Sequence, residues 1–152
     1  MKNAALLRSQ LDEVVSPLRK LRNIPPPPSG WIKAMREALG IPLRHLAKRL
    51  RSTTQNVQKL EFSERNASIS LKNMRKIADS LDMDFVYFLL PRDSSLEKML
   101  FVRAESVAKS ILNRAARSMS LEDQGTSKKR IEQAILEMTH ELVRTMPRHL
   151  WD

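Results

Sequence analysis

The chain has 152 residues, a length that fits one compact domain with an extension or two. With 41% hydrophobic residues, 5% aromatics and three glycines, its composition excludes a disordered chain and favours an all-helical fold. The net charge of +10 favours a polyanionic partner, most simply nucleic acid, and a soluble basic protein without such a partner is the alternative. The absence of cysteine excludes disulfides, cysteine-based zinc sites and a thiol nucleophile.

No apolar run approaches the ~20 residues that cross a bilayer. The first residues also lack the apolar core of a signal peptide. We therefore expect a cytoplasmic protein that does not engage a membrane.

Apolar residues at three- to four-residue spacing predict a helix over residues 4–22. Pro17 should kink this helix or start a second turn of it, because proline has no N–H and clashes with the preceding turn. Pro25 to Pro28 then form a stiff, extended spacer. The predicted divisions are an N-terminal helical arm (1–24), a proline-rich linker (25–30), a central domain (31–91) and a C-terminal helical region (92–152).

The central domain is expected to contain helices over residues 32–39, 43–51, 54–62 and 71–81. Ser29 or Gly30 can cap the first of them, Gly40 ends it in the left-handed conformation, and Ser70 caps the last. The FVYFLL segment at 85–90 is continuous and apolar. We interpret it as a short buried strand or a final core segment, because periodicity does not distinguish the two.

Two longer helices are predicted in the C-terminal region, over residues 94–118 and 127–145, with a break at Gln124-Gly125. Ser94 or Ser95 can cap the first helix. The arm, the FVYFLL segment and these helices are all candidate surfaces for a dimer or a protein partner.

The strongest functional signal lies between Leu43 and Glu61. A helix-turn-helix needs a small residue where its two helices cross, and Ala47 occupies that place. Thr53 or Thr54 can cap the second helix. The apolar residues that flank the crossing are Leu46, Leu50, Val57 and Leu60. An ordinary pair of packed helices is the alternative, which the basic flanks disfavour.

The outer face of the second helix carries side chains suited to DNA. The amides of Gln and Asn both donate and accept hydrogen bonds, which matches the N6/N7 edge of adenine. The predicted DNA-binding residues are Arg44, Arg51, Thr53, Thr54, Gln55, Asn56, Gln58, Lys59 and Arg65. Further basic residues expected at flanking phosphates are Lys33, Arg36, Lys48, Arg49, Lys72, Arg75 and Lys76.

Nothing in the sequence indicates an enzyme. No His, Asp and Glu cluster has the spacing of a metal site or a general base, and there is no glycine-rich phosphate loop. We expect no catalytic residue, no metal and no cofactor.

Residues 32–83 resemble the five-helix DNA-binding domain of the XRE family of phage-type repressors. The run LRHLAKRLRSTTQNVQKLE carries the resemblance, with Ala47, Val57, Leu60 and Glu61 in the expected places. The resemblance implies an all-α fold, in which N-terminal and C-terminal helices flank the repressor-like domain. That family usually has Gly where this chain has Arg51. An arginine in the left-handed conformation would destabilise the fold by about 1 kcal/mol. Either a phosphate contact offsets this cost, or the turn differs slightly from that of the family.

A longer resemblance covers nearly the whole chain. The segments SPLRKLRNIPPPPSGWIKAMREALGIPLRHLAKRL, DFVYFLLP, SMSLEDQ and HLWD are similar to the mobile mystery protein A family. Proteins of that family resemble antitoxins, and a neighbouring gene typically encodes a Fic-domain protein. The resemblance implies the antitoxin of a type II toxin–antitoxin pair. Such an antitoxin neutralises a Fic-domain AMP-transferase and represses its own operon, acting as a homodimer on double-stranded DNA.

Two other functions stay open. The first is a stand-alone repressor of a mobile element, without a toxin partner. The second is an inhibitor scaffold whose basic surface binds an acidic toxin and no DNA.

Many Fic enzymes are held inactive by a helix of pattern Ser/Thr-x-x-x-Glu-Gly/Asn, whose Glu pairs with an Arg needed for the ATP γ-phosphate. The same spacing occurs at Ser9–Glu13 and Ser118–Glu122, without the following Gly or Asn. Since about one such pair arises by chance, each pair is more commonly a solvated helix face. We favour Ser118–Glu122, which lies where the chain resembles the family. Ser9–Glu13 is the rival, because prolines separate its arm from the domain.

Overall fold

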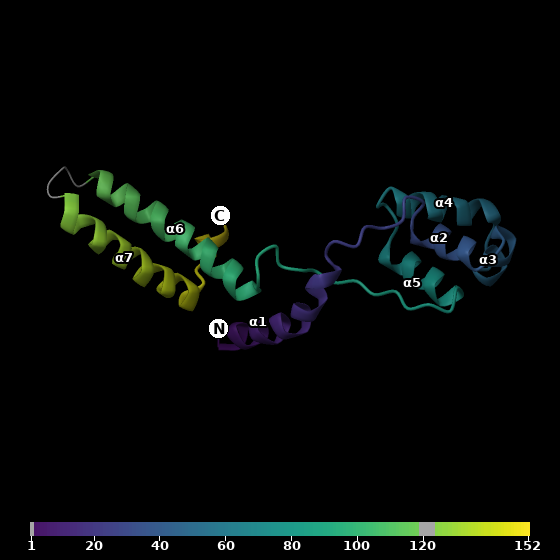
Figure 1. Cartoon of the computed structure of the whole chain (residues 1–152), viewed down its shortest axis with the longest axis horizontal. Coiled ribbons are helices and arrows are strands. Elements are labelled where there is room, and N and C mark those ends of the chain that lie inside the picture. The colour runs from purple at the N-terminus through teal and green to yellow at the C-terminus, as the bar shows by residue number, and fades with distance from the viewer. Residues whose placement is uncertain (1, 119–123) are drawn as a thin grey trace. The chain divides into compact units, whose positions relative to one another are not determined.

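The computed structural model describes residues 2–118 and 124–152. The chain divides into two compact units, one of Asn23–Phe88 and one that combines Met1–Arg22 with Leu89–Asp152. The described residues form helices and no strand, which confirms the expected all-α fold (Figure 1). Among them, none of the helices combines the length and the apolar character that crossing a bilayer requires.

Four helices build the unit of Asn23–Phe88: α2 (Trp31–Ala38), α3 (Leu43–Arg49), α4 (Thr54–Arg65) and α5 (Leu71–Ser80). Each contributes apolar side chains to one core. The buried core residues are Ile32, Leu46, Ala47, Leu50, Val57, Ile77 and Leu81. Three of the four expected helices differ from the observed ones by at most two residues at either end, and α4 extends three residues further than expected.

The helix ends follow the local chemistry of the sequence. Gly40 has a φ of 63°, the left-handed conformation expected after α2. The hydroxyls of Thr53 and Ser70 cap α4 and α5, accepting hydrogen bonds from the backbone N–H of Asn56 (3.1 Å) and Asn73 (3.2 Å).

The N-terminus of α2 is capped from a distance. Gly30 is the N-cap residue, but the capping carboxylate belongs to Glu64 on α4. Glu64 accepts hydrogen bonds from the backbone N–H of Trp31 (2.7 Å) and of Ile32 (2.9 Å). A Cβ on Gly30 would lie 2.7 Å from Oε2 of Glu64, so the glycine leaves room for this contact.

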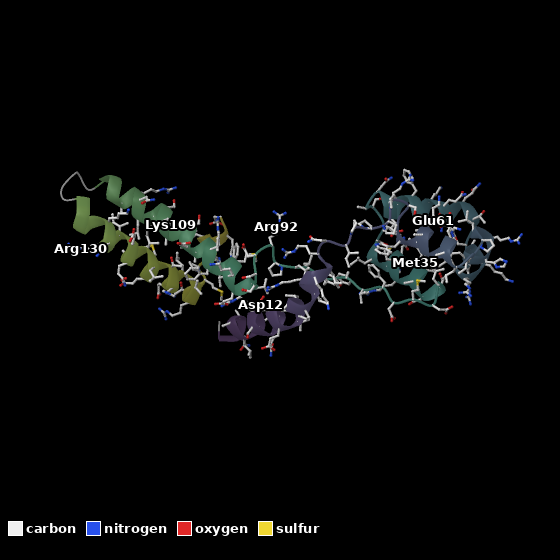
Figure 2. All side chains as sticks on the ribbon, in the orientation of Figure 1. Asp12, Met35, Glu61, Arg92, Lys109 and Arg130 are labelled. Atoms are coloured by element: carbon white, nitrogen blue, oxygen red, sulfur yellow. The ribbon has the colours of Figure 1, made fainter. Side chains whose placement is uncertain are left out.

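A buried ion pair joins α2 to α4. Nε of Arg36 donates to Oε1 of Glu61 at 2.7 Å, and Nη1 donates to the carbonyl of Ile41 at 3.2 Å. Each residue of the pair is 7% exposed (Glu61 is labelled in Figure 2). The hydrogen bond to Glu61 raises the pKa of Arg36 above its ordinary value. The expectation that Arg36 contacts a phosphate is wrong, because its guanidinium is committed inside the core.

The other unit contains α1 (Lys2–Val15), the 3-10 helix η1 (Ser16–Leu21), α6 (Leu96–Ser118), α7 (Gln124–Thr145) and the 3-10 helix η2 (Arg148–Trp151). At Pro17 the α-helix has already given way to η1, which begins at Ser16. Helices α6 and α7 run side by side (Figure 1). Their shared core consists of Leu100, Ala104, Ala108, Leu142 and Leu150.

Helix α1 is attached to the start of α6 by polar contacts. The carboxylate of Asp12 accepts hydrogen bonds from the backbone N–H of Leu96 (2.7 Å) and of Glu97 (3.2 Å). Nε of Arg8 forms an ion pair with Glu97 at 2.8 Å. The sequence-based division treats residues 1–24 as a separate arm, whereas these contacts group the first 22 residues with α6 and α7.

The FVYFLL segment at 85–90 differs from both of its expected forms. It has no regular secondary structure, and the side chains of Val86 and Leu89 are 78% and 89% exposed. The interpretation as a buried strand or a final core segment is wrong. Within the described residues the chain offers no strand beside which this segment could lie.

We predict that Glu61→Gln lowers the free energy of unfolding of this unit by about 3 kcal/mol, because it removes the charge of the buried partner of Arg36 and leaves only the exposed Glu37, at 3.5 Å, as a counter-ion. Urea unfolding followed by Trp31 fluorescence, in a Trp151→Phe background, measures the change.

The matched control is Asp82→Asn, which removes the carboxylate of the exposed ion pair with Arg49. That change should alter stability by less than about 1 kcal/mol. Equal effects of the two amide variants would contradict a special role for the buried pair.

Candidate nucleic-acid interface

Helices α3 and α4 cross closely through a short turn. Leu46, Ala47 and Val57 are buried at the crossing, as the sequence predicts. The turn is closed by backbone hydrogen bonds, from the N–H of Ser52 to the carbonyl of Ala47 (2.9 Å) and from the N–H of Arg51 to that of Lys48 (3.1 Å). This packing fixes the direction in which α4 leaves the turn.

Arg51 adopts the left-handed conformation in this turn, with a φ of 51°. The turn therefore has the geometry that a glycine would favour, and the alternative of a different turn is excluded. Because arginine disfavours this conformation, Arg51 destabilises the folded domain by about 1 kcal/mol. Its side chain is exposed.

Asn56 takes part in the structure of the turn. Its side-chain Nδ2 donates to the hydroxyl of Ser52 at 2.8 Å, while its backbone N–H donates to Thr53. The amide retains its carbonyl oxygen and its second N–H hydrogen. A carbonyl oxygen and an amide N–H are the kinds of group that a contact with adenine uses, so the bond to Ser52 holds the side chain and leaves one of each.

The rest of the predicted reading face is exposed on α4, including Thr54, Gln55, Gln58 and Lys59. Gln55, Gln58 and Lys59 line a shallow hollow of about 490 Å³ together with Phe62 and Ser63. A concave strip of amide, ammonium and hydroxyl groups can accept the edges of base pairs.

Phe62 was not among the sequence-predicted site residues. Its ring is 57% exposed at the edge of the hollow, and the guanidinium carbon of Arg65 lies 5.2 Å from the ring centroid. Such a cation–π contact restricts the arginine and leaves the N–H groups of its guanidinium edge able to donate. The only signal in the sequence was an aromatic residue three positions before an arginine on a polar face.

The flanking basic side chains fall into two groups. Those exposed around the motif are Arg44, Lys48, Arg51, Lys72 and Lys76. Others already have a contact within this unit: Arg49 donates to the carbonyl of Ser80 (2.7 Å), Arg75 lies over the ring of Tyr87 (5.8 Å), and Lys33 lies 3.9 Å from Glu37.

Comparison with known families agrees with this geometry. Residues 32–88 match the family model described as Helix-turn-helix. This segment is a helix-turn-helix domain. Its presence makes the chain a sequence-specific DNA-binding regulator of transcription. No curated protein and no solved structure matches the chain significantly.

The two candidate pairs for toxin inhibition lie outside the helix-turn-helix domain. Ser9 and Glu13 are exposed on α1, where both line a hollow of about 610 Å³ with Asp12, Ser16, Arg19, Ser95 and Glu97. Ser118 ends α6, but its side chain and all of Glu122 lie outside the described residues.

We predict that Arg51→Gly raises the free energy of unfolding by roughly 0.5–1 kcal/mol, because glycine adopts a positive φ without strain. The same variant should weaken DNA binding and reduce the salt dependence of affinity by about one phosphate contact. Ala67→Gly is the control, since Ala67 also has a positive φ (55°) but follows the far end of α4. It should stabilise the protein and leave DNA affinity unchanged; a loss of affinity in both variants would contradict the phosphate contact.

We also predict that Gln55→Ala lowers discrimination between operator variants at one base pair by about 1–3 kcal/mol, because it removes a base-edge contact. Fluorescence anisotropy on a panel of single-base operator variants measures this. Lys76→Ala, on α5, should instead weaken binding to every duplex by a similar factor. Unchanged discrimination in Gln55→Ala would show that another face of α4 meets the bases.

Proposed function

We propose that this protein is a repressor that binds its own operator as a homodimer and is also the antitoxin of a Fic-domain AMP-transferase. The observation that carries the DNA-binding half is the exposed N-terminal part of α4. It presents Thr54, Gln55, Gln58 and Lys59 outward while a buried crossing with α3 holds the helix in position.

In this proposal α4 enters the major groove and its first two turns read base edges. Gln55 and Asn56 make the amide contacts with adenine, and Lys59 takes a guanine edge or a phosphate. Arg44, Arg51 and Arg65 neutralise phosphates around the groove. The backbone N–H groups at the capped N-terminus of α4 add a partial positive charge where a phosphate can approach. The net charge of +10 speeds the encounter with DNA at low salt.

The antitoxin half rests on the resemblance to the mobile mystery protein A family, and the division of the chain is compatible with it. The unit that contains α1, α6 and α7 is separate from the helix-turn-helix domain. On α1, Arg8 and Asp12 contact the start of α6, whereas Ser9 and Glu13 are exposed. A glutamate from one of the two candidate helices would pair with the Fic arginine that the ATP γ-phosphate requires.

We predict that cells expressing the adjacent Fic gene stop growing and are rescued by this protein. Glu122→Gly should abolish rescue if Ser118–Glu122 is the inhibitory pair, because the carboxylate that competes with the ATP γ-phosphate is lost. Glu13→Gly tests the rival pair. Gln10→Gly is the matched control for Glu13→Gly, since it places glycine at another exposed position of α1. It should leave rescue intact.

The outcomes separate the functional alternatives. Full rescue by both glutamate variants would exclude insertion of either glutamate and leave inhibition by covering the toxin surface. An adjacent gene that is not toxic, or toxicity without rescue, would leave a stand-alone repressor of a mobile element.

A further inference from the structure

Helix α4 carries one large apolar side chain on its exposed polar face. Gln55, Gln58, Lys59 and Phe62 are all exposed, and they follow one another at the three- to four-residue spacing that places side chains on one face of a helix. The buried side chains of α4, Val57 and Glu61, fall outside this spacing and pack on the other side. Phe62 therefore belongs to the proposed reading face and not to the core.

The hollow on this face has polar walls and one apolar wall. Gln55, Gln58, Lys59 and Ser63 supply amide, ammonium and hydroxyl groups, and the ring of Phe62 supplies the apolar wall. In the major groove the base edges offer hydrogen-bonding groups and a single methyl group, the C5-methyl of thymine. An aromatic ring among polar side chains thus complements a base pair that contains thymine.

The length of α4 lets Phe62 and Gln55 reach bases at the same time. A helix rises about 1.5 Å per residue, so the seven positions between the two residues correspond to about 10.5 Å along its axis. Successive base pairs are about 3.4 Å apart. When α4 lies along the groove, the two side chains meet base edges about three base pairs apart.

The ring of Phe62 is already held against α4 in the free protein. The guanidinium carbon of Arg65 lies over the ring, 5.2 Å from its centroid. The side chain is still 57% exposed, so much of the ring surface is open to a ligand. A side chain that is restricted before binding loses less conformational freedom when it meets its partner, and the contact is correspondingly stronger.

We propose that Phe62 is a specificity-determining residue whose ring packs against the C5-methyl group of a thymine. This thymine lies about three base pairs from the base that Gln55 contacts. The inference deepens the proposed function, on which it rests for the entry of α4 into the major groove. A contact of the ring with sugar or phosphate would give no such preference, because every nucleotide carries these groups.

The test removes the methyl group of thymine and nothing else. The full chain first selects a duplex from a random pool, and each thymine of that duplex is then replaced singly by uracil, which lacks the C5-methyl. At the thymine that Phe62 contacts, uracil should weaken binding by about three- to fivefold, the loss expected for one buried methyl group. Fluorescence anisotropy at constant salt measures the affinities.

Variants assign the effect to the ring. Phe62→Ala should bind the thymine and uracil duplexes equally, because the group that meets the methyl is gone. Phe62→Leu keeps an apolar side chain and should retain most of the discrimination. The matched control is Leu39→Ala, since Leu39 is 54% exposed in the same unit but does not line the hollow. It should discriminate as the wild type does.

Two results would overturn the inference: uracil that weakens binding at no position, or a uracil effect that persists in Phe62→Ala. An equal loss of affinity for every duplex in Phe62→Ala would also overturn it, because that loss indicates a contact with the DNA backbone.

Gln55→Ala, measured on single-base variants of the selected duplex, separates this inference from the proposed function. If Gln55→Ala relaxes base preference while uracil has no effect, only the role of Phe62 is refuted and α4 still reads bases. A chain that selects no sequence from the pool would refute base reading by α4 itself.

Discussion

The buried contact between Arg36 and Glu61 determines how α4 is held. It joins α2 to α4, and through the carbonyl of Ile41 it also holds the turn that leads into α3. Glu64, less than one turn further along α4, caps the N-terminus of α2. One side of α4 thus supplies the carboxylates that orient it against the core, while another side is free to meet DNA. A buried ion pair adds less to net stability than its strength suggests, but it penalises every other orientation of the two helices.

Most of the helix-turn-helix domain could be predicted from the sequence, because its determinants lie close together along the chain. The small residue at Ala47 and the caps at Thr53 and Ser70 each depend on neighbours within a few turns, whereas the left-handed Arg51 was implied by the family resemblance. Arg36 was wrongly assigned to a phosphate contact, because a basic residue is expected to be exposed unless its buried partner is known. That partner, Glu61, is 25 positions away in the sequence. The same reason hides the cap of α2 by Glu64 and the contact of Asp12 with α6.

The composition of the proposed reading face could be predicted from the sequence, but its side-chain contacts could not. The exposure of Thr54, Gln55, Gln58 and Lys59 follows from the helical period of α4. The hydrogen bond from Asn56 to Ser52 and the stacking of Arg65 on Phe62 depend on side-chain rotamers, which a residue pattern does not specify. The FVYFLL segment shows a further limit, since an apolar run predicts that a surface will be covered without identifying the molecule that covers it.

One of the two units combines residues from both ends of the chain, and this affects the order in which the units fold during synthesis. The helix-turn-helix domain lies in one continuous stretch, Asn23 to Phe88, so this domain can fold before α6 emerges from the ribosome. Helix α1, although made first, must wait for Leu96 and Glu97, 84 and 85 positions later, before Asp12 finds its partners. A protease that removes α6 and α7 therefore releases α1 while it spares the DNA-binding fold. Proteolytic turnover would separate the two units and leave the helix-turn-helix domain folded.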